Sequence, residues 1–214
     1  SNEELASEVV AKIHEIGQKA IAIKADVSKE EDIVNLFVQI DKKLGKLAAL
    51  VNNAGILLPQ SRIEDITAER INELMTTNVT SYFLCCREAI KRMSKKHGGT
   101  GGSIVNVSSA ASRLGSPNEY VDYAATKGAI DTLTTGLSLE LADEGIRVNC
   151  VRPGFIHTNM HADGGEPNRI NRVKDNIPLK RGGLPSEVSS AITYLISEQA
   201  SYVTGSFIDL AGGK

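Results

Sequence analysis

The feature that most constrains this chain is a series of short apolar runs that alternate with amphipathic helical patterns. Nearly continuous apolar strands are typical of a parallel sheet that is covered by helices on both faces. Strands that alternate with helices along the chain indicate parallel crossovers. The pattern therefore predicts an α/β fold, a Rossmann-type doubly wound parallel sheet in a single domain over residues 1–214. The expected strands are residues 20–25, 47–52, 103–108, 146–151 and 206–210.

Helix signals lie between these strands. Asn2 is expected to cap a first helix that ends at Gly17, and Ser28 opens a capping box for a second. Thr67 is expected to cap a long helical region, and Pro185 stands at a favourable first position of the last helix. The later helices are expected at about residues 28–43, 67–96, 118–142 and from 185 onward.

Composition and charge exclude several classes of protein. The formal net charge of −2 argues against a nucleic-acid-binding surface. No apolar run approaches the ~20 residues that a bilayer-spanning helix needs, and no signal peptide opens the chain. The three cysteines lack zinc-ligand spacing. We therefore expect reduced, core-packed thiols in a cytoplasmic protein, with no metal site and no membrane or nucleic-acid partner.

Tyr123 and Lys127 stand four residues apart in a helical pattern, so their side chains lie on one helix face. A phenol has a pKa near ~10 and is by itself a poor acid-base catalyst at neutral pH. A nearby ammonium favours the phenolate and lowers that pKa. The pair is therefore a candidate proton-transfer device.

Further polar and turn residues follow the strands, at the edge where open α/β sheets bind ligands. Asn53, Ala54 and Gly55 follow one strand, Ser108 and Ser109 end the next, and Pro153 and Gly154 end the third. Asn78 interrupts the long helical region, where a polar side chain needs a partner. Their order along the chain makes a chance combination a poor explanation.

The whole set resembles the short-chain dehydrogenase/reductase family, in the style of glucose/ribitol-type or 3-oxoacyl-reductase-like members. The resemblance implies an NAD(P)-dependent oxidoreductase that interconverts a secondary alcohol and a ketone by hydride transfer. It covers the whole chain and rests on Asp26-Val27, Asn52-Asn53-Ala54-Gly55, Asn78, Ser109, Tyr123-x-x-x-Lys127, Pro153-Gly154 and Tyr202-Val203-Thr204-Gly205.

The resemblance also implies catalytic roles. Tyr123 would be the general acid and base, and Lys127 would lower its pKa and bind the nicotinamide ribose. Ser109 would donate to the substrate oxygen. The interval from Ser109 to Tyr123 is one residue longer than is usual in the family, so Ser108 is a second choice. Asn78 would hold a water that links Lys127 to the solvent.

The cofactor would be NAD or NADP, and the sequence does not distinguish them, because the discriminating residue follows a strand that this chain lacks. Asp26 and Val27 would meet the adenine, and Ile156 and Thr158 would hold the carboxamide. The full set implied for cofactor binding is Asp26, Val27, Asn53, Ala54, Gly55, Tyr123, Lys127, Pro153, Gly154, Ile156 and Thr158.

One departure from the family is large: the glycine-rich fingerprint and the first two strands are absent. In the family's strand order, the strand at residues 20–25 would then have no neighbour and its backbone groups no partners. We therefore expect an N-terminally incomplete domain, with about 35 to 40 residues missing. The alternative is a non-catalytic relative that serves as a dinucleotide-binding sensor or an interaction subunit.

The expected substrate loop spans about residues 158–180 and is polar. Asn159, His161, Asp163 and Glu166 favour a small polar carbonyl or alcohol, such as a sugar or polyol, over a long acyl chain. His157 and His161 are candidates to line the substrate. The resemblance further implies a homodimer or homotetramer that pairs the two long helices.

Overall fold

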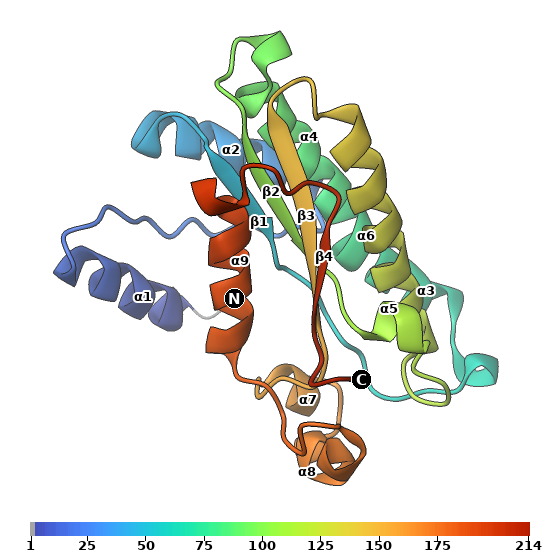
Figure 1. Cartoon of the computed structure of the whole chain (residues 1–214). Helices are drawn as coiled ribbons and strands as arrows, with labels where there is room; N and C mark the ends of the chain where they lie inside the picture. The colour runs from blue at the N-terminus through green and yellow to red at the C-terminus, as the bar shows by residue number, and fades with distance from the viewer. Residues whose placement is uncertain (1–2) are drawn as a thin grey trace.

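The computed structural model describes residues 3–214, and its centre is a four-stranded parallel sheet with strand order β1-β2-β3-β4 (Figure 1). The strands are β1 (Ala49–Asn52), β2 (Gly102–Val107), β3 (Ile146–Pro153) and β4 (Phe207–Leu210). Each strand is parallel to the next, which requires a crossover between neighbours. The α/β class and four of the predicted strands are confirmed.

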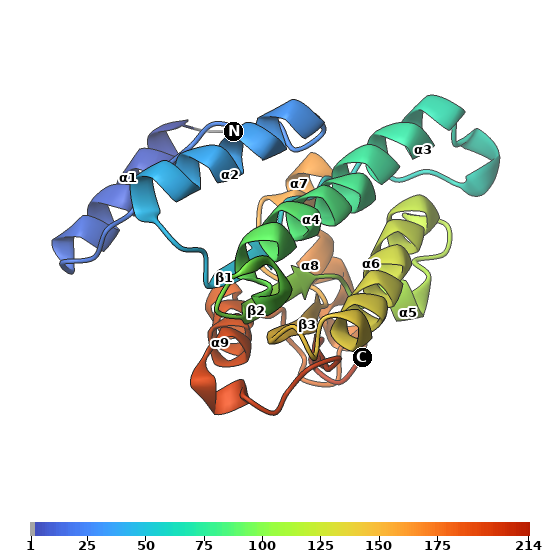
Figure 2. The same cartoon turned by 90° about the horizontal axis from the view of Figure 1, so that it is seen from above.

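Helices cover both faces of this sheet (Figures 1 and 2). The helices α2 (Glu30–Leu44), α4 (Ser81–Met93) and α6 (Val121–Glu140) pack on one face, where they meet Ile104 and Val148. The helix α9 (Pro185–Ile196) packs on the other face, against Val105 and Val151. Because side chains alternate along a strand, both faces of β2 and β3 are buried. That burial accounts for the continuous apolar runs in the sequence.

The helix expected to begin near Thr67 is divided. The Thr67 side chain caps α3 (Ala68–Met75) by accepting from the Arg70 N–H at 3.3 Å. A π-helical turn, Thr76–Thr80, then joins α3 to α4 and contains Asn78. Such turns are commonly found at functional sites. The break that Asn78 suggests in the sequence is therefore confirmed.

The remaining described elements are short, apart from α1 (Glu3–Glu15). Pro185 begins α9 as predicted. The helix α6 begins later than expected, because Ser116 and Asn118 before it adopt positive φ angles. The other helices are α5 (Ala111–Leu114), α7 (Met160–Asp163), α8 (Arg169–Val173) and the 3₁₀ turns Ile63–Asp65, Lys95–His97, Lys174–Asn176 and Glu198–Ala200.

Two predictions near the start of the chain are wrong. Residues 20–25 belong to none of the described strands, which agrees with the expectation that a strand there would lack a neighbour. Ser28 does not cap α2, because Lys29 occupies the N-cap position and the Ser28 hydroxyl instead donates to Asp26 at 2.7 Å. Asn2 lies outside the described residues. The helix α1 buries none of its residues and stands away from the sheet (Figures 1 and 2).

Over residues 3–214, we find no helix that combines the length and the apolar character needed to cross a bilayer.

Candidate active site

A cleft of about 690 Å³ lies at the carboxyl ends of β1, β2 and β3. Its walls come from the loops after these strands, from α6 and from the first turns of α9. Because the carboxyl ends of parallel strands meet at one edge, residues distant in sequence converge there. Predicted site residues that line the cleft are Asn53, Ala54, Gly55, Ser109, Tyr123, Lys127, Pro153, Gly154, Ile156 and Thr158.

Lys127 is a buried cation at the inner wall of the cleft, with only 3% of its surface exposed. Its ammonium donates to the Val107 carbonyl at 2.9 Å and lies 5.4 Å and 5.6 Å from the ring centroids of Tyr82 and Tyr123. Burial lowers the pKa of Lys127 to about 8, against the opposing influence of Cys150 and Asp131. The sequence spacing therefore does place the lysine against the Tyr123 ring.

Tyr123 is half-buried, and burial raises its pKa to about 12. The Ser109 hydroxyl and the positive charge of Arg169 oppose this rise. The direction is opposite to that expected from the Tyr–Lys pair. The physical reason is that removal of the phenolate from water outweighs the nearby charges. Lys127 also lies over the face of the ring and donates elsewhere.

The two serines after β2 point in different directions. Ser108 is buried, and its hydroxyl donates to the Lys127 carbonyl at 3.0 Å, which ties the strand end to α6. Ser109 lies beside Tyr123 in the cleft, and its hydroxyl oxygen accepts from the Ala111 N–H at 3.1 Å. Both serines line the cleft, and of the two it is Ser109 that also lines the smaller pocket next to it, together with Tyr123.

Asn78 holds the loop that follows β1. Its side-chain oxygen accepts from the Ile56 N–H at 2.8 Å, and its amide donates to the Ile56 carbonyl at 3.0 Å. A methyl group at Gly55 would lie 3.3 Å from the Asn78 oxygen and 3.7 Å from the Lys127 ammonium. A glycine therefore lets the loop backbone approach both side chains closely.

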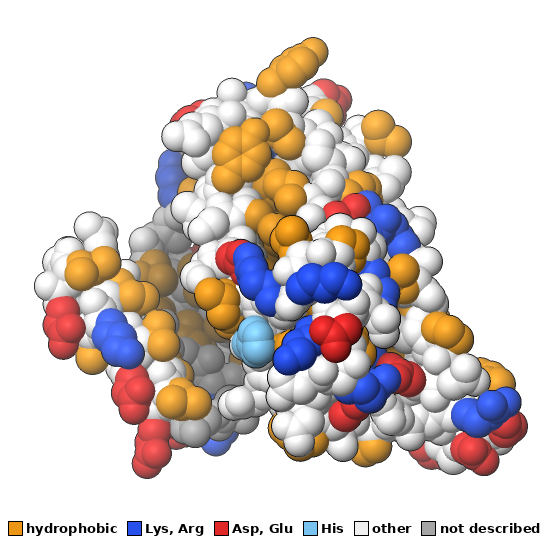
Figure 3. Space-filling model, turned by 60° about the horizontal axis from the view of Figure 1, so that its bottom comes forward, with side chains coloured by type: hydrophobic (Ala, Val, Ile, Leu, Met, Phe, Trp, Pro, Cys, Tyr) orange, Lys and Arg blue, Asp and Glu red, His pale blue; other side chains and the backbone are white. Residues whose placement is uncertain are grey.

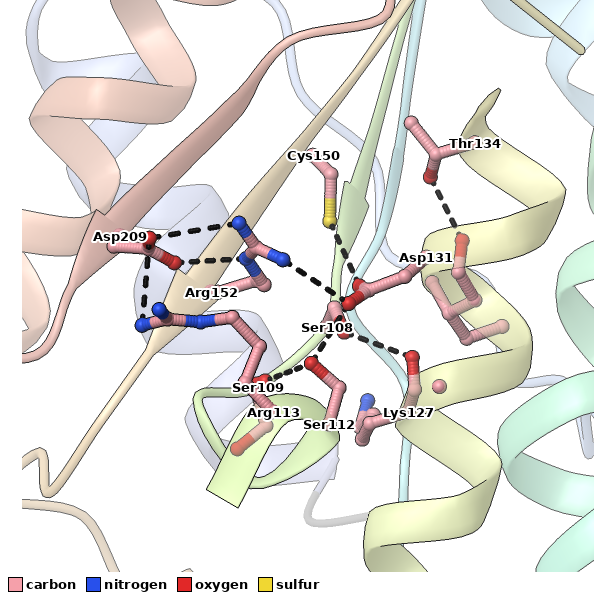
Figure 4. A network of polar contacts seen from close by, with 12 residues as sticks. Ser108, Ser109, Ser112, Arg113, Lys127, Asp131, Thr134, Cys150, Arg152 and Asp209 are labelled. Atoms are coloured by element: carbon pink, nitrogen blue, oxygen red, sulfur yellow. Dashed lines mark hydrogen bonds and ion pairs between the residues drawn. The ribbon is translucent and has the colours of Figure 1, made fainter. Parts of the chain in front are cut away.

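A polar network fixes the chain behind Ser109 (Figure 4). The Ser112 hydroxyl lies 2.8 Å from the Ser109 carbonyl and 2.7 Å from Asp131. Arg152 then connects Asp131, at 3.3 Å, to Asp209 on β4, at 2.7 Å. These contacts join α5, α6, β3 and β4, so they restrict the position of the turn that carries Ser109.

Two expected cofactor residues do not reach the cleft. Asp26 is exposed and accepts hydrogen bonds from Ser28, and Val27 packs against the core that α2 and α4 form. Neither lines the cleft. The segment before α2 pairs with none of the described strands, so the sheet does not fix it at the ligand-binding edge.

A smaller pocket of about 90 Å³ adjoins the cleft and shares Ser109, Tyr123 and His161 with it. Arg169 and Lys214 also line it, and no sequence pattern pointed to either residue. Tyr120 is fully buried there, and its hydroxyl donates to the Gly164 carbonyl at 3.0 Å. His157 lines a different, outer pocket.

The walls of the cleft differ in character. The ammonium of Lys127 and the hydroxyl of Tyr123 lie on one wall, and Val188 and Ile192 of α9 form an apolar wall. The chemistry available is a phenol proton donor, a second hydroxyl donor and a buried cation within one cavity. Such a set can stabilise and protonate an oxygen that becomes negative during a reaction.

Comparisons with known proteins agree with this geometry. A family model described as enoyl-(acyl carrier protein) reductase matches residues 1–214. The uncharacterized oxidoreductase YgfF of Escherichia coli (strain K12) is 67% identical over 209 residues, which are 98% of this chain and 85% of that protein. Glucose 1-dehydrogenase 2 of Bacillus subtilis (strain 168) is 36% identical over 208 residues, 97% of this chain and 80% of that protein. A crystal structure described as a putative gluconate dehydrogenase from Agrobacterium tumefaciens has a TM-score of 0.89 and 32% identity, and the match covers 100% of this chain and 83% of that one.

Proposed function

The chain belongs to the short-chain dehydrogenase/reductase family and is an NAD(P)-dependent oxidoreductase, and on that premise we propose that it interconverts a secondary alcohol and a ketone. One observation carries the proposal: Ser109, which follows β2, lines a single cleft together with Tyr123 and Lys127 of α6. Asn78 supports the same cleft from the π-helical turn.

In carbonyl reduction, Tyr123 donates its phenolic proton to the substrate oxygen. The raised pKa of Tyr123 keeps it protonated at neutral pH, which is the form that a general acid needs. Ser109 donates a second hydrogen bond to the same oxygen as negative charge develops there. In alcohol oxidation Tyr123 accepts the proton, and the Lys127 charge beside its ring favours the phenolate.

The dinucleotide, when bound, supplies or accepts the hydride. Lys127 would hold its nicotinamide ribose, and Ile156 and Thr158 would hold its carboxamide. The loop backbone at Asn53, Ala54 and Gly55 would pass beside it. Pro153 and Gly154 complete this side of the cleft.

We propose a small polyhydroxylated substrate. The names of two relatives, a glucose dehydrogenase and a gluconate dehydrogenase, support this class. The polar side chains of Ser109, Tyr123, His161 and Arg169 in the pocket also support it, because they can bind hydroxyl groups. A cytoplasmic location and a homodimer or homotetramer are part of the same proposal; light scattering of the purified protein would test the oligomer.

The decisive experiment is Tyr123→Phe, assayed with NAD and NADP on a panel of polyols, sugars, ketones and an enoyl thioester. We expect kcat to fall by about 10²–10⁴-fold, the usual contribution of a general acid. Tyr194→Phe makes the same chemical change on the outer side of α9 and serves as the control, because Tyr194 does not line the cleft.

The outcomes are distinct. Undiminished turnover by Tyr123→Phe would refute the mechanism. Turnover of the enoyl thioester alone would replace the alcohol–ketone reaction with reduction of a carbon–carbon double bond. Dinucleotide binding without turnover of any compound would favour the non-catalytic alternative.

A further inference from the structure

The small pocket beside Tyr123 carries an unusual concentration of unsatisfied polar groups. Three side-chain nitrogens are buried without a hydrogen-bond partner among the described residues: Arg70 Nη2, His161 Nδ1 and Arg169 Nε. His161 and Arg169 line the same pocket. A buried donor or acceptor without a partner destabilises the folded state, so two in one pocket call for a physical reason.

Arg169 is a buried cation in the pocket wall, with 9% of its side chain exposed. Its guanidinium lies over the rings of Tyr120 and Phe155, at 4.3 Å and 5.3 Å from their centroids. Nη2 donates to Glu119 at 2.6 Å, whereas Nε has no acceptor, the nearest carboxylate being Glu166 at 4.0 Å. The site therefore holds an ordered guanidinium with unused donor capacity.

Among the described residues, the ion pairs of this pocket include Arg169 but not Lys214. Glu119 and Glu166 pair with both Arg169 and Arg172, so these four groups balance. Lys214 adds a further cation, because its ammonium lies 5.4 Å from the same Phe155 ring that Arg169 covers. The face in Figure 3 shows a histidine with Lys and Arg side chains near it and Asp and Glu side chains among them.

His161 presents a different group. Its Nε2 lies 3.0 Å from the Ile156 carbonyl, and because a carbonyl only accepts, the hydrogen is assigned to Nε2. Nδ1 of the neutral ring is then an acceptor without a donor. Burial and the neighbouring Arg169 lower the pKa of His161, which keeps the ring neutral. A hydroxyl group would supply the missing donor.

We propose that the substrate is a hydroxy acid, such as a sugar acid, whose carboxylate is bound by Arg169 and Lys214 and whose hydroxyl donates to His161. This inference rests on the proposed function, because the pocket also contains Tyr123 and Ser109. Its volume of about 90 Å³ is that of about three water molecules, enough for a carboxylate and the carbon beside it. The rest of the substrate lies in the adjoining cleft.

The test compares a sugar acid with its own primary amide, which has the same shape without the charge. We expect kcat/KM to favour the acid by at least about tenfold in the wild-type protein, as for a charge-assisted contact. Arg169→Gln should remove this preference, mainly by raising KM for the acid. Turnover of the amide should fall less than turnover of the acid.

Arg172→Gln is the matched control. Arg172 pairs with the same two glutamates, but its side chain is half exposed and does not line the pocket. The Arg172→Gln variant should lose the stability that the two ion pairs of Arg172 provide, but its preference for the acid should persist. Equal loss of preference in both variants would show that the ion-pair cluster acts only on loop structure, and would overturn the inference.

Thermal shift with the same acid provides a measurement that is independent of turnover. We expect the acid to raise Tm in the wild-type and Arg172→Gln proteins and not in Arg169→Gln. Absence of a shift in the wild type, or a wild-type kcat/KM for neutral polyols that exceeds the kcat/KM for the acid, would overturn the substrate class alone. A Tm shift without turnover of any alcohol or ketone would instead count against the proposed reaction and leave acid binding supported.

Discussion

Lys127→Met should make the protein more stable and inactive. Burial lowers the pKa of Lys127 from its ordinary 10.5 to about 8, so the folded protein carries an ammonium that would be more favourable in water. At about 1.4 kcal/mol for each pH unit, the charge destabilises the fold by about 3 kcal/mol at pH 7. Methionine has a similar length and no charge.

Part of this gain is offset by contacts that the lysine makes. The ammonium lies over the rings of Tyr82 and Tyr123, and such contacts contribute about 0.5–1 kcal/mol each. The Val107 carbonyl loses one hydrogen bond but keeps the one from the Tyr82 hydroxyl at 3.0 Å. We therefore expect a net increase of about 1–2 kcal/mol in the free energy of unfolding at pH 7.

The pH dependence gives a stricter test. Because the folded-state pKa lies below that of the unfolded chain, the unfolded chain binds the proton more tightly between about pH 8 and 10.5. Wild-type stability from this group therefore rises with pH across that window, and the advantage of Lys127→Met should shrink there. Urea denaturation at pH 7 and at pH 10.5 would measure it, with the exposed Lys42→Met as control. A variant no more stable than wild type at pH 7, or an advantage independent of pH, would refute the reasoning.

Three further predictions concern the neighbourhood of the cleft. Asn78→Ala should lower the free energy of unfolding by about 1–3 kcal/mol, because two backbone groups of Ile56 lose their hydrogen-bond partner. The control Thr80→Ala changes an exposed residue of the same π-helical turn and should leave stability unchanged, and equal effects of the two variants in a denaturant titration would contradict the prediction. Ser109→Ala should lower kcat by about 10²–10³-fold. Ser108→Ala should lower the free energy of unfolding by about 1 kcal/mol and change kcat at most a few-fold, and the reverse kinetic result would assign the catalytic role to Ser108. Burial raises the thiol pKa of Cys85 to about 11 and the thiol pKa values of Cys86 and Cys150 to about 12. Iodoacetamide at pH 8 should therefore modify these cysteines only after unfolding, and a modified cysteine found by mass spectrometry of the native protein would contradict this.

Much of the candidate site could be predicted from the sequence, because its residues follow parallel strands. The positions of Ser109, Gly55 and Gly154 after apolar runs place them at one sheet edge whatever the packing details. The spacing of Tyr123 and Lys127 needs only helix geometry. These relations are local or topological, so they can be read from residue order.

Other features depend on long-range contacts and could not be predicted. Arg169 lies in a stretch with little periodicity, and only the packing of α8 against Tyr120 and Phe155 brings it beside Tyr123. The opposite direction of the Tyr123 pKa also has a tertiary cause, since burial is absent from a spacing argument. The predicted strand before Asp26 does not form, and the cause is again tertiary, because a strand forms only where another strand offers hydrogen-bond partners.

The sequence by itself therefore determined the α/β class, the parallel order of the elements and the residues that gather at the carboxyl edge of the sheet. These follow from hydrophobic periodicity and from the rule that connected parallel strands end on the same side. Only the tertiary structure decided that Ser109 and not Ser108 faces Tyr123 in the pocket, that Lys127 is desolvated, and that Arg169 and His161 share a pocket with the proposed catalytic groups. Those outcomes depend on which surfaces are removed from water and on distances between segments far apart in the chain, which residue order does not specify.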